Sequence, residues 1–106
     1  MRCWSLLIGA RNVGAKRGRF TRADDDLIQK LTASHFPKGF TILRADGGWH
    51  DPAQGRFIRE ECRQILICDS RPAIIRWGKA LGRALRQKEL VLIQGGRALQ
   101  LKVRVQ

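Results

Sequence analysis

The chain has 106 residues, of which 43% are hydrophobic, so it suits one globular domain over residues 1–106 and leaves no room for a second. No apolar run approaches the ~18 residues that a membrane-spanning helix needs. Lysine and arginine number 21 against 9 aspartates and glutamates, which gives a formal net charge of +12. The expected partners are therefore anionic, with nucleic acid, nucleotides, phospholipid head groups and acidic proteins all admissible.

The N-terminal segment predicts a strand followed by a basic loop. The strand covers about residues 3–11. Its apolar residues occupy both odd and even positions, and successive residues of a strand face opposite sides, so we expect both sheet faces to be covered near Trp4–Ile8. A glycine-rich segment, "NVGAKRGRF", comes next. Its glycines give the backbone the freedom to place several cationic side chains around an anion, so the segment is a candidate ligand-binding loop.

A first helix is predicted after that loop. Thr21 with Asp24 three residues later forms a capping-box-like start, although Asp stands in place of Glu. The triplet Asp24–Asp26 favours the positive end of a helix, and we interpret it as capping and not as a metal site. The residues expected in the buried stripe are Leu27, Ile28 and Leu31. The segment Phe36–Gly39 ends the helix.

A hairpin occupies the middle of the chain. Its strands are predicted at about residues 40–45 and 57–69, joined by the stretch 46–61, "DGGWHDPAQGRFIREE". Three glycines and a proline in this stretch are typical of a long turn, because glycine reaches positive φ without strain and proline fixes its own φ. We therefore expect the stretch to be mostly turn.

The third strand has a clear alternation. Cys62, Leu66 and Cys68 share one parity and are expected to face inward. Glu60 shares that inward parity, so its carboxylate needs an arginine or backbone partner. Glu61 has the opposite parity and is expected to pair with arginines.

A second helix and two further strands follow. Ser70 and Pro72 open the helix, which spans about residues 71–87. Its expected buried side consists of Ile74, Trp77, Gly78, Leu81 and Leu85, and the cations expected opposite are Arg76, Lys79, Arg83 and Arg86. The last strands are predicted at residues 89–94 and 98–105, with a Gly-Gly turn between them.

This order of elements predicts the fold. A βαββαβ arrangement with right-handed crossovers gives an α+β, ferredoxin-like sandwich, in which an antiparallel sheet has both helices on one face and an extra C-terminal strand. The second sheet face is apolar enough to need cover. We therefore expect a homodimer or a higher homo-oligomer.

Cysteine usage predicts a reducing, cytoplasmic setting. The chain has 3 cysteines, Cys3, Cys62 and Cys68, which lie in apolar runs and form no C-x-x-C pair. We expect buried free thiols in place of a disulfide framework or a zinc site. No metal and no cofactor are predicted.

The central segment "FPKGFTILRADGGWHDPAQGRFIRE" resembles the signature of an uncharacterised family of small bacterial proteins. The resemblance covers about residues 4–93 and includes the later "LRQKELVLI". The positions that match the family pattern are Phe36, Pro37, Gly39, Thr41, Gly47, Trp49, Arg59 and Glu60. The family has no established activity, so the resemblance implies a domain of unknown function and no site roles.

Four residues of the hairpin are candidates for a functional role. Trp49 beside two glycines either folds back on the sheet as a lid or forms a stacking platform for a ring. His50, Asp51 and Glu60 could form an acid-base group, with the histidine titrating near neutral pH and a carboxylate orienting it.

Three function classes follow from these observations. The first is a non-enzymatic binding protein for a phosphate-bearing ligand, either a nucleotide, a nucleotide signal or a nucleic-acid backbone. The others are an assembly or adaptor protein and a small cofactor-free enzyme that uses His50, Asp51 and Glu60. We favour the binding protein and expect no enzymatic activity. The residues predicted to bind its ligand are Arg11, Lys16, Arg17, Arg19, Trp49, Arg59, Arg76, Lys79, Arg83 and Arg86.

Overall fold

The structure, a computed structural model, describes residues 2–10 and 18–105. Its elements, in chain order, are β1 (Arg2–Gly9), α1 (Arg22–His35), β2 (Thr41–Asp51), β3 (Arg56–Asp69), α2 (Arg71–Leu85), β4 (Glu89–Gln94) and β5 (Arg97–Lys102). Among the predicted ligand residues, Arg11, Lys16 and Arg17 lie outside the described residues.

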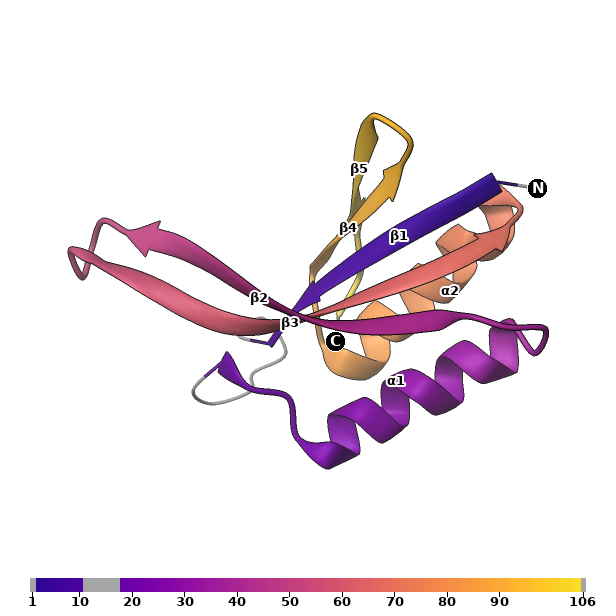
Figure 1. Cartoon of the computed structure of the whole chain (residues 1–106), viewed down its shortest axis with the longest axis horizontal. Helices are drawn as coiled ribbons and strands as arrows, with labels where there is room; N and C mark the ends of the chain where they lie inside the picture. The colour runs from indigo at the N-terminus through magenta and orange to yellow at the C-terminus, as the bar shows by residue number, and fades with distance from the viewer. Residues whose placement is uncertain (1, 11–17, 106) are drawn as a thin grey trace.

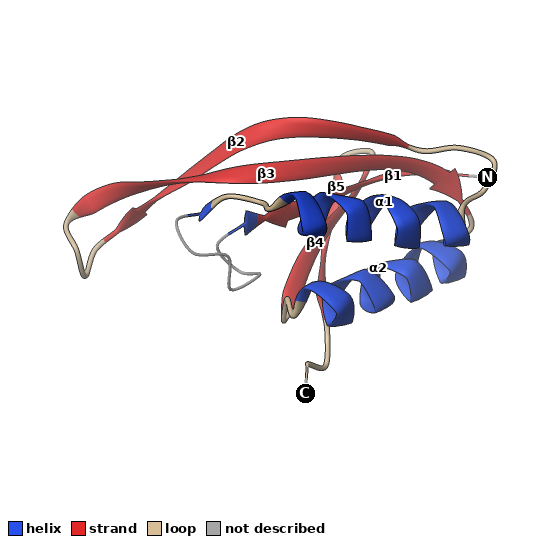
Figure 2. Ribbon diagram, turned by 90° about the horizontal axis from the view of Figure 1, so that it is seen from below, coloured by secondary structure: helices blue, strands red, loops and turns tan. Residues whose placement is uncertain are grey.

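The strands form one antiparallel sheet in the order β2-β3-β1-β4-β5. Both helices cover the same face of this sheet, and the opposite face has no helix over it (Figures 1 and 2). The α+β, ferredoxin-like prediction with an extra C-terminal strand is confirmed. None of the helices in the described part of the chain combines the length and the apolar character needed to cross a membrane.

Strand β1 alternates in burial along its length. Trp4, Leu6 and Ile8 are buried under the helices, whereas Ser5 and Leu7 on the opposite face are only partly buried. The expectation that both faces are covered is therefore not met within the chain itself.

Helix α1 begins as predicted at a capping box. Asp24 N donates to Thr21 Oγ1 at 3.1 Å, and Thr21 N donates to Asp24 Oδ2 at 2.8 Å. The predicted buried stripe is partly wrong, because Leu27 is 37% exposed. Thr32, one turn after the buried Ile28, lies in the core instead and accepts a hydrogen bond from the Trp77 indole.

Helix α2 agrees with the prediction closely. Ser70 is the N-cap, with a proline in the first turn, and all five residues of the expected buried side are buried. Arg76, Lys79 and Arg83 are exposed on the other side, and Arg86 ends the helix with a left-handed φ of 58°. The β4–β5 turn begins at Gly95, with φ at 57°.

The β2–β3 hairpin differs from the prediction in two ways. Its strands pair without interruption from Thr41↔Leu66 to Asp51↔Arg56, so most of the stretch read as a long turn is sheet. The inward parity on β3 is also the reverse of the predicted one. Ile65 and Ile67 face the helices, because these isoleucines bury more apolar surface than the cysteine and leucine that alternate with them.

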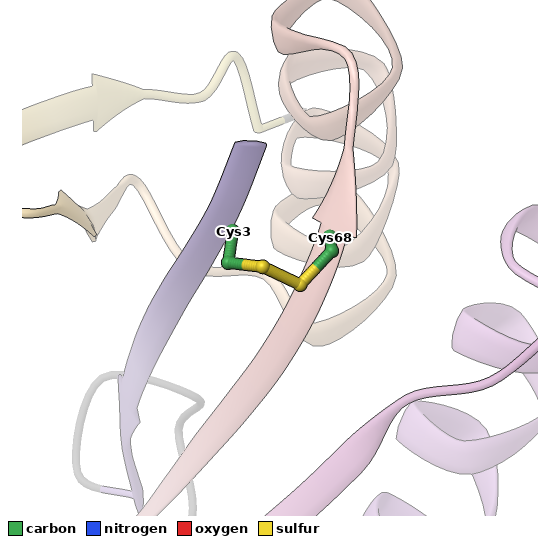
Figure 3. The surroundings of a disulfide bond; sticks show 2 residues. All are labelled: Cys3 and Cys68. Atoms are coloured by element: carbon green, nitrogen blue, oxygen red, sulfur yellow. A yellow bond between two sulfur atoms is a disulfide. The ribbon is translucent and has the colours of Figure 1, made fainter. Parts of the chain in front are cut away.

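The cysteines also differ from the prediction. Cys3 on β1 and Cys68 on β3 are directly opposite in the register and form a disulfide, shown in Figure 3. Both lie on the sheet face that the helices leave open, and both are exposed. Cys62 is free and partly buried. The expectation of buried free thiols is wrong for the paired cysteines, because the antiparallel register joins residues that are 65 apart in sequence.

Candidate functional site

The β2–β3 hairpin extends past the helices (Figure 1). The candidate site is a hollow lined by residues of this projecting part. Its volume is about 630 Å³, and it lies between the hairpin and the short segment that precedes α1. The lining residues are Gly18, Arg19, Asp46, Gly47, Gly48, Phe57, Arg59, Glu60 and Glu61. A protein with a net charge of +12 thus places 3 of its 9 acidic residues around one hollow.

Two of these acids face each other across the hairpin. Asp46 on β2 and Glu61 on β3 are register partners, so their side chains leave the same face of the sheet. Like charges directly opposite each other destabilise a sheet. Among the described residues, no hydrogen bond or ion pair engages the Asp46 carboxylate, whereas Glu61 Oε1 accepts the Phe20 backbone N–H at 2.8 Å. The arrangement favours a cation at this position.

Glu60 reaches the hollow from the opposite face of β3. A β-carbon added at Gly9 would lie 2.7 Å from Glu60 Oε1, so the carboxylate lies across the end of β1. The same carboxylate acts on the free thiol beside it. Burial raises the pKa of Cys62, Glu60 and then Asp46 raise it further, and Arg63 lowers it. Cys62 therefore stays a neutral thiol near neutral pH and is no candidate nucleophile.

Phe57 provides an aromatic surface at the hollow. Its side chain is 59% exposed, which is unusual for phenylalanine in so small a protein. The ring lies over the backbone of Gly48, where an added β-carbon would be 2.6 Å from Phe57 Cε1. Glycine at position 48 is required for this close approach and not for a turn.

A mostly buried cluster of Arg63, Asp25 and Phe20 adjoins the hollow through Glu61, which lines it. Arg63 is 3% exposed, and it donates from Nε to Asp25 Oδ1 at 2.9 Å and from Nη2 to Asp25 Oδ2 at 3.2 Å. The guanidinium also lies over the Phe20 ring, 4.6 Å from its centroid. The hydrogen bond that Arg63 donates to the Asp25 carboxylate raises the pKa of Arg63 above its usual value. This cluster ties the segment before α1 to β3.

The structure brings together some of the predicted site residues. Arg19, Arg59 and Glu60 all line the hollow. Trp49, His50 and Asp51 lie farther toward the hairpin tip and are not among the lining residues. Asp51 Oδ1 accepts the Ala53 N–H at 2.9 Å and so supports the turn. The cations of α2, Arg76, Lys79, Arg83 and Arg86, do not line the hollow either.

Sequence reasoning missed Asp46, Glu61 and Phe57 as neighbours. Asp46 was read as part of a turn, and Glu61 as an outward partner of arginines. The register that joins them follows only from the full length of the hairpin. Asp25 was read as a capping residue, although an arginine among the apolar residues of β3 is a signal that some acid must meet it.

The described part of the chain holds no group of three or more His, Cys, Asp or Glu side chains arranged to hold a metal ion. The carboxylates of the hollow project from both faces of β3, which explains why they do not converge on one point.

Two solved structures share this fold. A phage SAM lyase in the apo state is 16% identical, with a TM-score of 0.67 over 98% of this chain and 90% of that chain. A phage SAM lyase in complex with S-methyl-5′-thioadenosine is 19% identical, with a TM-score of 0.58 over 95% of this chain and 88% of that chain. At such identities the likeness shows the fold alone. No curated protein matches the chain.

These neighbours correct the functional prediction. The interpretation as a non-enzymatic binder of a phosphate-bearing ligand is contradicted, because both of these structures are of SAM lyases and one of them holds S-methyl-5′-thioadenosine, which has no phosphate. The preference for no enzymatic activity is wrong for the same reason. Both inferences rested on the net charge of the whole chain, which does not reveal that three carboxylates lie beside two arginines around the hollow.

The resemblance seen in the sequence is confirmed by the family comparison. A sequence profile matches residues 6–76, which include β2, β3 and every acidic residue of the hollow. The chain belongs to the family described as "Protein of unknown function (DUF3574)".

Proposed function

We propose that this protein is an enzyme that binds S-adenosylmethionine, or a nucleoside with the same sulfonium group, in the hollow and cleaves it as a lyase. The single observation that carries the proposal is the pair of facing carboxylates, Asp46 and Glu61, in the described hollow. The fold shared with phage SAM lyases supports the choice of substrate and reaction class.

The charge of the ligand is argued from the acid pair. A chain with a net charge of +12 repels cations at long range, so only a local concentration of carboxylates can hold one. Asp46 and Glu61 provide that concentration on one face, which they share with the exposed Arg59, and Glu60 adds a third carboxylate from the other face. A sulfonium has a permanent positive charge, and it relieves the repulsion within the facing acid pair when it binds.

The nucleoside part is argued from Phe57. An exposed aromatic ring stacks on a purine, and such stacking contributes ~1–3 kcal/mol per base. The same ring face also attracts a cation. Arg19, which is exposed at the rim of the hollow, can pair with the carboxylate of the amino acid part through two parallel N–H donors.

The chemistry follows from the substrate. A sulfonium sulfur leaves as a neutral thioether, so the electron pair of the broken carbon–sulfur bond stays on sulfur and S-methyl-5′-thioadenosine is released. The remaining amino acid fragment either gives a proton to a carboxylate such as Glu61, which leaves an unsaturated amino acid, or closes on its own carboxylate, which leaves a lactone. Both routes balance without water, and the identity of the second product distinguishes them.

The experiment is incubation of the purified protein with S-adenosylmethionine, followed by mass spectrometry for S-methyl-5′-thioadenosine and the second product. S-adenosylhomocysteine, which lacks the positive charge, should bind more weakly and stay intact. We expect Asp46→Asn combined with Glu61→Gln to lower kcat/KM by 100-fold or more, which corresponds to ~3 kcal/mol of transition-state stabilisation.

Asp26→Asn is the matched control, because it removes one negative charge from an exposed site that does not line the hollow. Its activity should equal that of the wild type. The proposal is wrong if the folded protein releases no S-methyl-5′-thioadenosine and shows no binding of S-adenosylmethionine at about 1 mM, the upper end of usual KM values.

A further inference from the structure

The face of the sheet that the helices leave open has an unusual composition. The register places on this outer face Cys3, Ser5, Leu7, Thr41, Leu43, Ala45, Gln64, Leu66, Cys68, Val91, Ile93, Ala98 and Gln100, together with positions nearer the ends of the strands. Figure 2 shows both helices on the other side of the sheet. Solvent-facing antiparallel sheets are usually polar on the open side.

Cations are absent from the middle of this outer face. The chain has 21 lysines and arginines, yet on the described strands the outer-face positions contain only Arg56, at the hairpin tip, and Lys102, on the edge strand β5. The exposed cations of the described residues lie instead on the helices, the loops and the inner or edge positions of the strands. Depletion of charge at the centre of a patch is typical of protein interfaces.

Apolar side chains are exposed in the same region. Leu43 is 43% exposed, Leu66 38% and Val91 37%. Leu7 on β1 pairs with Val91, and Ile93 follows Val91 on the same face of β4. The surface is also hollowed at one end. A cavity of about 1000 Å³ has Ser5, Leu66 and Ile93 of the outer face in its lining.

We propose that the outer face is the surface on which a second copy of this chain packs. An anionic partner such as nucleic acid or an acidic lipid surface would bind to cations, and this face lacks them over its centre. Two copies of a chain with a net charge of +12 repel each other, so a patch free of cations is where they approach at the lowest electrostatic cost.

The polar groups of the face suit self-association as well. Gln64 donates to Ser5 Oγ at 2.8 Å within the chain, and Thr41 and Gln100 lie on the same face. Such neutral groups pair across an interface without leaving a buried charge. The molecule extends 43 × 31 Å along its two longer axes, which gives room for the ~800 Å² per partner of a standard interface.

The test is the mass of the purified protein by light scattering at about 10 µM, because oligomers depend on concentration. We expect at least twice the chain mass of 12.0 kDa. The assembly should persist at about 1 M salt, since screening at that ionic strength acts on charges and this interface contains few. Leu66→Arg should give the mass of a single chain, and Val91→Arg should do the same independently.

Leu27→Arg is the matched control, because Leu27 on α1 is 37% exposed, close to Leu66 at 38% and Val91 at 37%, but lies away from the outer face. Circular dichroism establishes that each variant is folded. A single-chain mass for the folded wild type overturns the proposal, and so does an equal mass for Leu66→Arg, Val91→Arg and Leu27→Arg. Neither readout involves S-adenosylmethionine, so this proposal and the proposed activity fail separately.

Discussion

The β2–β3 hairpin has two halves that share one continuous register but differ in the burial and the chemistry of their inner-face side chains. In the half under α1, Ile42 pairs with Ile65, and both contribute to the core. The other half projects past the helices (Figure 1), and in it Gly48 pairs with Arg59 and His50 with Phe57. The first half is held by apolar burial, while the second has side chains exposed to water on its inner face.

The two halves show which side chains a pair of strands can hold where it extends beyond the core. Backbone hydrogen bonds continue the geometry of the core into a region where Ile58 is buried but the inner-face side chains are exposed. Once the covered half is folded, the projecting half can keep facing carboxylates and an exposed ring, which a free hairpin would not tolerate. Functional groups on strands are also positioned more accurately than groups on loops.

The largest expected difference between the halves is in stability. Ile65 is fully buried, so Ile65→Ala should lower the free energy of unfolding by ~3–4 kcal/mol through lost burial and a cavity. Phe57→Ala, in the projecting half, should cost less than ~1 kcal/mol while weakening binding of S-adenosylmethionine. Urea unfolding at one protein concentration measures both changes. Equal destabilisation by the two substitutions would contradict the comparison.

A second substitution tests the junction between the halves. Asp25→Ala leaves the buried Arg63 guanidinium without its carboxylate partner. We expect a loss of ~2–3 kcal/mol, somewhat below the usual cost of breaking a buried pair because the Asp25 side chain is 32% exposed. Asp26→Ala removes the same charge from the exposed neighbour and should stay within ~0.5 kcal/mol of the wild type. Thermal unfolding of the wild type, Asp25→Ala and Asp26→Ala shows whether stability depends on the Arg63–Asp25 ion pair or only on the loss of one negative charge.

Local patterns predicted the helices and the general fold. The spacing of Ile74, Trp77 and Leu81 is a property of one helix, and the caps at Thr21 and Ser70 act within three residues. Strand β4 was predicted with the bounds that the structure gives it. Such features need no knowledge of distant partners, and the order of elements then restricts the topology.

The candidate site depends on distant partners, and sequence reasoning recovered only part of it. The glycines at positions 47 and 48 resemble turn residues, but they lie in a strand where Cys62 and Phe57 occupy the space of a β-carbon. The residues on the opposite strand decide whether a glycine serves a turn or gives room for a neighbouring side chain. The Cys3–Cys68 disulfide follows from register in the same way.

The smallest expected effect concerns Cys62, on the outer face where the two halves meet. Burial raises its pKa above the ordinary value of 9.0, and the carboxylates of Glu60 and Asp46 raise it further, against the opposing charge of Arg63. The thiol of the unfolded chain therefore ionises at a lower pH than that of the folded chain. Between the two pKa values, ionisation of the thiol stabilises the unfolded state but not the folded state. The free energy of unfolding therefore falls as pH rises through this interval.

Wild-type stability should therefore fall between about pH 8 and about pH 10 more steeply than that of Cys62→Ser, which cannot ionise there. The chain contains no tyrosine, so no phenol adds to the difference over this range. Glu60→Gln should lessen the fall, and Asp46→Asn should lessen it to a smaller degree, because each removes a charge that disfavours the thiolate. Glu89→Gln, at the far end of the outer face on β4, should leave the fall unchanged. Parallel pH curves for the wild type and Cys62→Ser would mean that burial and the neighbouring carboxylates do not raise the pKa of this thiol. A smaller fall in Glu60→Gln than in the wild type would link the Glu60 carboxylate of the hollow to the stability of the hairpin that holds it.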